Sequence, residues 1–216
     1  ICGASVSCPE VARKAELNAI SGLEFLTGIP GSIGGAIRMN AGSYGQEMKK
    51  VLVSFDIIDL SGKTQNIKVD DLSFQYRKTN APDGWIFINA NIKGRYLDRA
   101  LIKEKMKKVR SSRSSSQPIK NRTSGSTFTN PLNLKAWELI DQAGCRGLNF
   151  GNASVSNQHC NFLINNGNAS AEEIESLGEQ VRERVYKKSG VKLRWEIIRV
   201  GVSASHQDSL LKLKEI

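Results

Sequence analysis

Three side chains that lie far apart in the sequence are suited to chemistry on an anionic substrate. The guanidinium of Arg77 can hold a carboxylate through paired hydrogen bonds or stabilise a developing enolate. Ser126 lies between Gly125 and Thr127, small neighbours that leave a hydroxyl accessible. Glu196 can orient or protonate a bound group if it faces a cleft. We therefore take Arg77, Ser126 and Glu196 as candidate catalytic residues.

Ordinary structural roles compete for the same three residues. Arg77 could be a solvated surface residue, and Ser126 could cap a turn, as most serines between small residues do. Glu196 lies in an apolar strand candidate, where alternation does not require it to be buried. An ion pair with Arg194 or Arg199 would also account for it. Residue type and spacing alone leave these alternatives open.

A glycine-rich segment, residues 21–47, contains seven glycines but is too apolar for a flexible linker. Within it, GIPGSIGG (28–35) leaves backbone N–H groups that side chains do not cover, and such groups can bind a pyrophosphate. The spacing matches neither a P-loop nor a dinucleotide fingerprint, so a purely structural turn remains an alternative. We expect an ordered loop that a ligand or another segment approaches closely.

Hydrophobic periodicity predicts the elements that must position these residues. Apolar spacing predicts helices over 9–20, 98–110 and 134–143, and alternation predicts strands over 51–59, 64–69, 85–93, 162–166 and 193–201. A longer helix begins after Ser170, which forms a capping box with Glu173, and ends at Gly190. The segment SSRSSSQ (111–117) has the composition of a linker and indicates a nearby domain boundary.

The chain is basic, with 31 Lys and Arg against 21 Asp and Glu and a net charge of +10. Its densest basic stretches are residues 103–122 and 182–199. This balance favours anionic ligands, although an ordinary solvated surface would have the same composition. No apolar run approaches the length of about 18 residues that a membrane helix needs, so we expect no membrane association.

The cysteine and histidine pattern does not indicate a metal site. The four cysteines form no CxxC pair, and the two histidines, His159 and His206, lack ligand spacing. We predict no bound metal and interpret the cysteines as unpaired thiols in a reducing cytoplasm. The cysteines are Cys2, Cys8, Cys145 and Cys160.

Several sequence blocks, taken in order, resemble one enzyme family over roughly residues 1–201. The blocks are SGLEFLTGIPGSIGGAIRMNAGSYGQE, FQYRKT, QPIKNRTSGSTFTNP, LIDQAGCRGLNFGNASVSNQHCNFLINNGNAS and WEIIRVG. In this order they resemble the UDP-N-acetylenolpyruvoylglucosamine reductase (MurB) family. The resemblance implies an α+β fold: the second half of an FAD-binding domain of the vanillyl-alcohol-oxidase type, followed by the MurB substrate-binding domain. We expect these units at 1–97 and 98–204, with a tail at 205–216.

The family resemblance also implies a reaction. Members bind FAD, reduce it with NADPH, and reduce the enolpyruvyl double bond of a UDP-sugar to give UDP-N-acetylmuramate. This is a step of peptidoglycan precursor synthesis, which supports cell-wall biogenesis, cell shape and division. We accordingly expect a cytoplasmic, monomeric oxidoreductase whose ligands are FAD, NADPH and the UDP-sugar enolpyruvate, without nucleic-acid or membrane partners.

The resemblance assigns roles to residues by position. Arg77 and Glu196 match residues that polarise the substrate carboxylate and stabilise the enolate-like intermediate, and Ser126 matches the proton donor. Substrate contacts are implied for Tyr76, Arg77 and Asn130. FAD contacts are implied for Gly28, Ile29, Pro30, Gly31, Ser32, Gly34, Gly35, Asn40, Gly42, Tyr44 and Gly45.

Two features depart from the family pattern. Most members have Lys where this chain has Thr129, so one cation that could assist substrate binding is replaced; Lys120 and Arg122 are nearby alternatives. The chain also starts at Ile1, without the N-terminal Gly-Ser-Asn block with which the family holds FAD. We therefore expect residues 1–216 alone to bind FAD poorly and to be inactive.

Two other functions remain open from the sequence. One is an oxidase of the same flavoenzyme superfamily, although no His or Cys stands out as a covalent flavin anchor. The other is a basic nucleic-acid-binding module that uses residues 103–122. That segment contains no aromatic residue for base stacking, and a salt-dependent interaction with oligonucleotides would be needed to support it.

Overall fold

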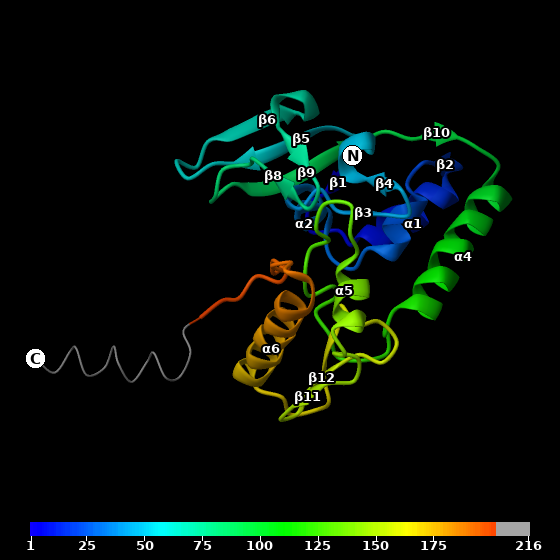
Figure 1. Cartoon of the computed structure of the whole chain (residues 1–216). Coiled ribbons are helices and arrows are strands. Elements are labelled where there is room, and N and C mark those ends of the chain that lie inside the picture. Colours follow the sequence, from blue (N-terminus) through cyan, green and yellow to red (C-terminus); the bar gives the residue numbers. More distant parts are fainter. Residues whose placement is uncertain (202–216) are drawn as a thin grey trace, which may run out of the picture. The chain divides into compact units, whose positions relative to one another are not determined.

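The structure, a computed structural model, describes residues 1–201 as two compact units that divide after Ser115 (Figure 1). Both units contain helices and strands, which confirms the predicted α+β class. The tail predicted at 205–216 lies outside the described residues.

An antiparallel sheet forms the centre of the first unit, with strand order β1-β9-β5-β6. Leu52, Phe55 and Ile57 of the central strand β5 are buried, and register shifts against β9 at Leu52/Ser54 and Asp56/Ile57 interrupt simple alternation. The strands are β1 (Cys2–Gly3), β5 (Leu52–Ile58), β6 (Thr64–Lys68) and β9 (Ile86–Ile92), so the predictions over 51–59, 64–69 and 85–93 are confirmed.

Short helices pack against this sheet and complete the core. The helix predicted at 9–20 is α1 (Cys8–Leu17), with Ser7 as its N-cap and Pro9 in its first turn. The helices α2 (Ile33–Arg38), α3 (Met48–Val51), η1 (Glu24–Gly28) and η2 (Val69–Asp71) follow. Three two-stranded pairs complete the unit: β2 (Ile20–Ser21) with β10 (Arg95–Tyr96), β3 (Gly42–Ser43) with β4 (Gln46–Glu47), and β7 (Phe74–Gln75) with β8 (Lys78–Thr79).

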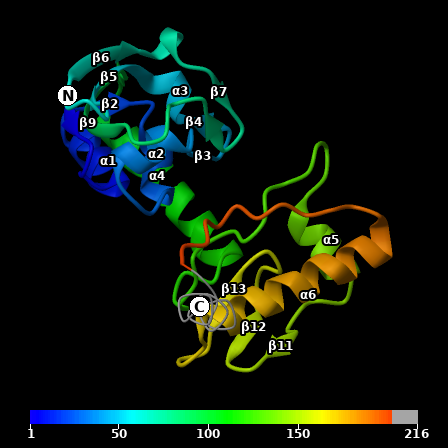
Figure 2. The same cartoon turned by 90° about the vertical axis from the view of Figure 1, so that its left-hand side faces the viewer.

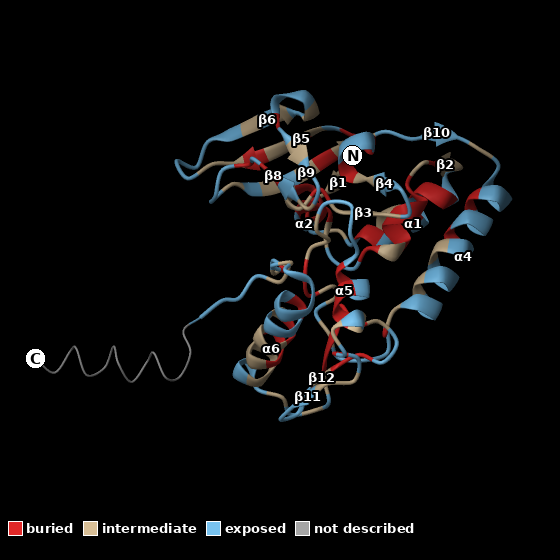
Figure 3. Ribbon diagram, in the orientation of Figure 1, coloured by how far each residue is buried: buried red, intermediate tan, exposed pale blue. Residues whose placement is uncertain are grey.

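The segment predicted as a linker, residues 111–117, is mostly helical, and the two units divide within it rather than at the expected 97/98. Helix α4 runs over Arg99–Ser116 and therefore includes most of the serine-rich segment. Ile102 and Met106 are buried in the core of the first unit, while most of α4 is exposed (Figure 3). Ion pairs Arg99–Glu16 and Lys105–Glu24 also join α4 to this unit. Because of these contacts, residues 98–115 belong with the first unit rather than the second.

The second unit packs two helices against a small antiparallel sheet (Figure 2). The helix predicted between Ser170 and Gly190 is confirmed: Ser170 and Glu173 form the capping box, and Gly190 ends the helix. The apolar side of this helix buries Leu177 and Val181. The elements are α5 (Ala136–Gln142), β11 (Asn149–Phe150), β12 (Ala153–Val155), β13 (Leu163–Asn165) and α6 (Ala171–Ser189).

Two predicted elements differ in the structure. Residues 193–201 form no regular strand; a single bridge joins Trp195 to Phe128, because the partner segment is itself short and irregular. Part of the glycine-rich segment is helical, since Ser32 caps α2 by accepting a hydrogen bond from the N–H of Gly35 at 3.3 Å. The cap compensates for the low helix propensity of two glycines.

Candidate functional site

Arg77 occupies the two-residue turn between β7 and β8. Its φ of 54° is in the left-handed region, which costs a residue with a Cβ about 1–2 kcal/mol. Its Nη2 donates to the carbonyl of Gly42 at 3.0 Å, and its guanidinium lies 5.0 Å from the ring centroid of the exposed Tyr76. The turn therefore places Tyr76 and Arg77 next to the β3–β4 hairpin.

The buried side chain of Asn40 holds the β3–β4 hairpin in place through hydrogen bonds. Its Nδ2 donates to Glu47 Oε2 and to the carbonyl of Gln75, both at 3.1 Å, and its Oδ1 accepts from the N–H of Lys49 at 3.1 Å. The side chain is buried. Asn40 thus holds the hairpin against β7, and Arg77 makes a second link between the same two elements.

Several backbone donors of the GIPGSIGG loop have partners within the chain. The N–H groups of Ile33 and Gly34 donate to the carbonyls of Val6 at 2.9 Å and Ala4 at 2.8 Å. Gly34 also packs closely, since an added Cβ would lie 3.2 Å from the Cβ of Ala4 and 3.3 Å from that of Phe87. These contacts pack the start of α2 against residues 4–6 and against β9.

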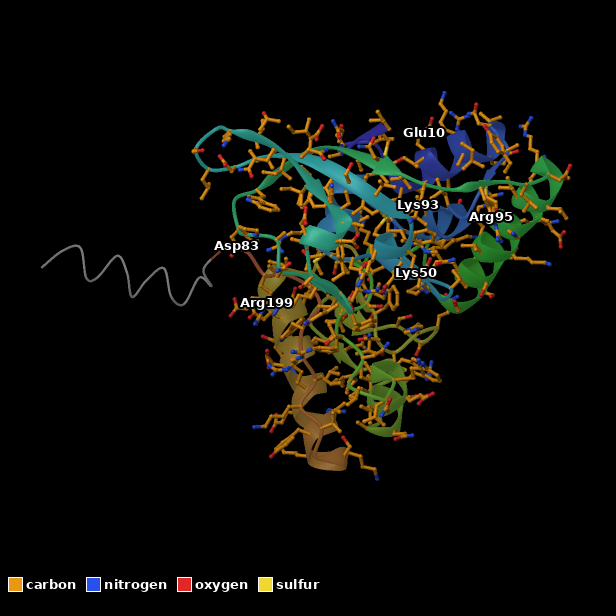
Figure 4. The ribbon with its side chains drawn as sticks, turned by 90° about the horizontal axis from the view of Figure 1, so that it is seen from above. Glu10, Lys50, Asp83, Lys93, Arg95 and Arg199 are labelled. Carbon is orange, nitrogen blue, oxygen red and sulfur yellow. The ribbon has the colours of Figure 1, made fainter. Side chains whose placement is uncertain are left out.

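Other parts of the loop and the hairpin face open space. An added Cβ at Gly31 (φ 116°) or Gly45 (φ 78°) would meet nothing within 4 Å, and both φ values favour glycine. Tyr44 is 49% exposed, and its ring borders Gly28. Lys50, labelled in Figure 4, donates to the carbonyl of Gly45 at 2.8 Å and secures the turn. The hairpin tip and Gly31 therefore present accessible backbone.

In the second unit, the structure brings Ser126 and Glu196 to neighbouring positions. The N–H of Glu196 donates to the carbonyl of Thr127 at 2.8 Å, and the N–H of Thr129 donates to the carbonyl of Arg194 at 2.9 Å. Ser126 forms a bridge with Phe162 on the other side of the same segment. The segment 126–129 thus lies between the 161–163 region and the 194–196 region, and both Ser126 and Glu196 are half-buried.

Asn161 is a residue that the sequence reasoning did not identify. Its carbonyl accepts from the N–H of Thr127 at 2.8 Å. Its side chain accepts from the N–H of Phe128 at 2.9 Å and donates to the carbonyl of Phe128 at 2.8 Å. No local sequence signal marks it, because Phe128, the partner of its side chain, is 33 positions away.

His159 contacts the backbone of Asn161. The N–H of Asn161 donates to His159 Nδ1 at 3.2 Å, so the imidazole is neutral at this nitrogen. Its ring makes an edge contact with Phe162 at 4.8 Å. Burial lowers the pKa of His159, and the charge of Arg146 lowers it further. This histidine therefore remains an acceptor at neutral pH.

Other polar contacts near these residues involve α5 and α6. Asn130 Oδ1 accepts from the N–H of Ala136 at 2.9 Å, at the start of α5. Arg199, labelled in Figure 4, pairs with Glu175 and lies 3.7 Å from Glu179. Arg199 therefore has two carboxylates of α6 as partners.

The predicted residues are divided between the two units. Arg77, Tyr76 and the predicted cofactor residues belong to the first unit, and Ser126, Asn130 and Glu196 belong to the second. A cavity of about 770 Å³ in the first unit is lined by α1, β1, β2 and β10 residues, including Glu10 and Tyr96. None of the predicted site residues lines this cavity.

Within residues 1–201, no three His, Cys, Asp or Glu residues are grouped so that they could hold a metal ion. No helix in the same range is long and apolar enough to cross a membrane. The four cysteines are free thiols, and Cys8, Cys145 and Cys160 are buried.

Comparisons with known proteins cover both units. Residues 1–68 match the FAD binding domain family, and residues 117–200 match the C-terminal domain of UDP-N-acetylenolpyruvoylglucosamine reductase. The reductase of Paramagnetospirillum magneticum is 53% identical over 89% of this chain and 62% of its own length. That of Rickettsia bellii is 47% identical over 95% of this chain and 68% of its own length.

A solved structure agrees with these relatives. The crystal structure of UDP-N-acetylenolpyruvylglucosamine reductase (MurB) from Thermus caldophilus matches with a TM-score of 0.82 at 33% identity, and covers 90% of this chain and 70% of that chain. The chain spans 62–66% of the length of the first curated relatives that it matches, those of P. magneticum, Azorhizobium caulinodans and Gluconobacter oxydans.

Proposed function

The chain belongs to the UDP-N-acetylenolpyruvoylglucosamine reductase family, and from this premise we propose that it reduces the enolpyruvyl double bond of a UDP-sugar in peptidoglycan precursor synthesis. FAD is the proposed cofactor, NADPH the proposed reductant and UDP-N-acetylmuramate the proposed product. The observation that carries the proposal is the placement of Ser126 beside Glu196, since the N–H of Glu196 donates to Thr127, the residue after Ser126.

The first unit contains residues that fit a flavin nucleotide. Gly31 and Gly45 leave backbone uncovered toward open space, and Tyr44, next to Gly45 in the sequence, offers an exposed aromatic ring. We assign these residues, with Ser32 and Gly42, to FAD contacts. Gly34 and Asn40 would support the site from behind, because their own contacts lie within the chain. When bound, FAD supplies the hydride-transfer chemistry that side chains lack.

Arg77 would offset the charge that develops on the substrate. Addition of a hydride to the double bond builds negative charge next to a carboxylate, and a fixed guanidinium stabilises that charge in a site that excludes water. A guanidinium can hold a carboxylate through paired hydrogen bonds, and the bond from Nη2 to the carbonyl of Gly42 fixes where this one lies. The strained backbone at Arg77 supports a functional role, because such strain concentrates at functional sites.

Ser126 would deliver the proton to the carbon next to the carboxylate. A serine hydroxyl is a weak acid, but an enolate is a strong base and needs only a positioned donor. Glu196 would orient the substrate enolate or carboxyl group from the neighbouring segment. Tyr76 and Asn130 remain the proposed substrate contacts, with Thr129 in place of the lysine that most members have.

The experiment that tests the proposal uses the full-length gene product loaded with FAD. NADPH oxidation is measured with and without UDP-N-acetylglucosamine enolpyruvate, and the product mass is determined. Substrate-dependent oxidation with a gain of two hydrogens supports the proposed reaction, and Ser126→Ala should lower kcat by about 10²–10⁴-fold. Ser124→Ala, an exposed serine in the same loop, is the matched control and should retain activity. Flavin-loaded protein without substrate-dependent oxidation would exclude the reaction and direct attention to an oxidase.

A further inference from the structure

On one side, the segment that carries Ser126 is held by hydrogen bonds from a single residue. Asn161 makes three hydrogen bonds to it: its carbonyl binds the N–H of Thr127, and its side-chain amide binds both the N–H and the carbonyl of Phe128. All three lie between 2.8 and 2.9 Å. The side-chain amide accepts one hydrogen bond from the backbone of Phe128 and donates one to it, as the backbone of a residue in a neighbouring β-strand does.

The surroundings make this pairing rigid. Asn161 is only 4% exposed, and Phe128 and Thr127 are also buried. If the Asn161 side chain were removed, water could not take over its hydrogen bonds to Phe128. A buried donor or acceptor without a partner costs about 1–3 kcal/mol. The N–H of Asn161 is fixed in turn by His159 Nδ1 at 3.2 Å. Asn161 is thus held on both sides, and it determines the path of the chain immediately after Ser126.

We propose that Asn161 is a positioning residue for proton delivery by Ser126. The inference rests on the proposed function of Ser126. The side-chain amide holds the peptide groups on both sides of Phe128 and so keeps the Thr127 N–H on the Asn161 carbonyl, which limits rotation of the Ser126 backbone and hence the direction of its hydroxyl. Misplacement of a reacting group by about 1 Å can lower a rate by about 100-fold. The same segment also binds Glu196 through the Thr127 carbonyl.

The test compares Asn161→Ala with a matched control in the full-length, FAD-loaded enzyme. Asn165→Ala is the control, because Asn165 Oδ1 also accepts two backbone N–H bonds, from Gly167 at 2.9 Å and Ala169 at 3.0 Å, but in the turn that precedes α6. We expect Asn161→Ala to lower kcat about 10–100-fold with KM for the UDP-sugar enolpyruvate within about threefold. Flavin reduction by NADPH should keep its rate, and Asn165→Ala should keep its kcat.

A second measurement reports the geometry without catalysis. Amide hydrogen exchange at Phe128, whose N–H loses its side-chain acceptor, should speed up in Asn161→Ala and stay unchanged in Asn165→Ala when it is followed by NMR in the 216-residue chain. Asn161→Asp is the variant for use if the alanine variant fails to fold. It conserves volume and the acceptor for the Phe128 N–H, but it places a carboxylate oxygen against the Phe128 carbonyl in place of the donor, so it should lower kcat at least as much as alanine does.

The outcomes separate this inference from the proposed function. A folded Asn161 variant with wild-type kcat, in an enzyme in which Ser126→Ala is slow, would overturn the positioning role alone. Wild-type kcat in Ser126→Ala would instead remove the proposed role of Ser126. A loss of kcat that merely follows thermal stability across the Asn161 and Asn165 variants would also overturn the inference, because general destabilisation would then explain it.

Discussion

Gly178 in α6 links helix packing to the position of Glu196. An added Cβ at Gly178 would overlap Cη2 of the Trp195 ring and lie 2.6 Å from its Cζ2. The indole is confined elsewhere, since its centroid is 4.9 Å from that of Phe128 and its Nε1 donates to Glu179 Oε1 at 2.8 Å. Gly178→Ala therefore requires Trp195 to move, and Glu196 is the next residue along the chain.

Two opposing effects determine the size of the change. Alanine in place of glycine inside a helix normally stabilises a protein by about 0.5–1 kcal/mol. Overpacking of a filled core costs about 1–3 kcal/mol, and here the overlap is with rigid ring carbons rather than with a flexible side-chain end. We expect a net decrease of about 1–2 kcal/mol in the free energy of unfolding of the second unit.

Urea unfolding, followed by tryptophan fluorescence and by circular dichroism, measures this decrease. Trp195→Phe removes the overlapping ring atoms, so Gly178→Ala should cost less in that background than in the wild type. Gly35→Ala in α2 is the control, because its added Cβ would meet only Ser32 Oγ at 3.6 Å. Equal stability of Gly178→Ala and wild type, or strict additivity in the double variant, would refute the steric reasoning.

Three further predictions follow from the same structure. Burial lowers the pKa of His159 below its ordinary value of 6.5, so the neutral form is favoured by folding; its contribution to stability is complete above pH 6.5 and is lost as the pH falls through the folded-state pKa. Urea titrations at pH 5 and 8 should show a larger acid loss in wild type than in His159→Asn, and equal losses would contradict the assignment. Burial raises the pKa of Cys8 and of Cys160 to about 11 and also raises that of Cys145, so these thiols should react with a disulfide reagent at pH 8 only on unfolding. Rapid labelling of all three in the folded chain would show that they are accessible. Arg77→Lys keeps the charge but removes the fork that donates to Gly42, so kcat/KM of the full-length enzyme should fall by about 100-fold or more with its FAD content unchanged. A lysine variant with wild-type kcat/KM would show that charge alone suffices.

The sequence predicted the longer helices and strands well, because their caps and their apolar periodicity lie within one segment of the chain. The capping box of Ser170 and Glu173, and the glycine at 190, define α6 within one segment of the chain. The alternation in residues 51–59 and 85–93 likewise predicted β5 and β9, although register shifts between the two strands interrupt it. The serine-rich stretch was predicted wrongly as a linker, because its composition hides the burial of Ile102 and Met106 one to three turns earlier, which anchors α4.

The candidate site could be predicted only in part. Motif order placed Ser126 and Glu196 in their blocks, but their adjacency depends on pairing between segments almost 70 residues apart, such as the bond from the Glu196 N–H to the Thr127 carbonyl. Asn161 left no pattern, because a single buried amide has no periodicity. The open backbone at Gly31 and the closed packing at Gly34 also look alike in sequence, and only their neighbours distinguish them.

The most direct test of the proposed function separates the two half-reactions. The full-length, FAD-loaded enzyme is reduced with NADPH without oxygen, then mixed with UDP-N-acetylglucosamine enolpyruvate, and flavin absorbance is followed in wild type and Ser126→Ala. We predict rapid, substrate-dependent reoxidation in wild type, slower reoxidation by about 10²-fold or more in the variant, and equal rates of reduction by NADPH. Equal reoxidation rates in the two proteins, or none in the wild type, would contradict the account.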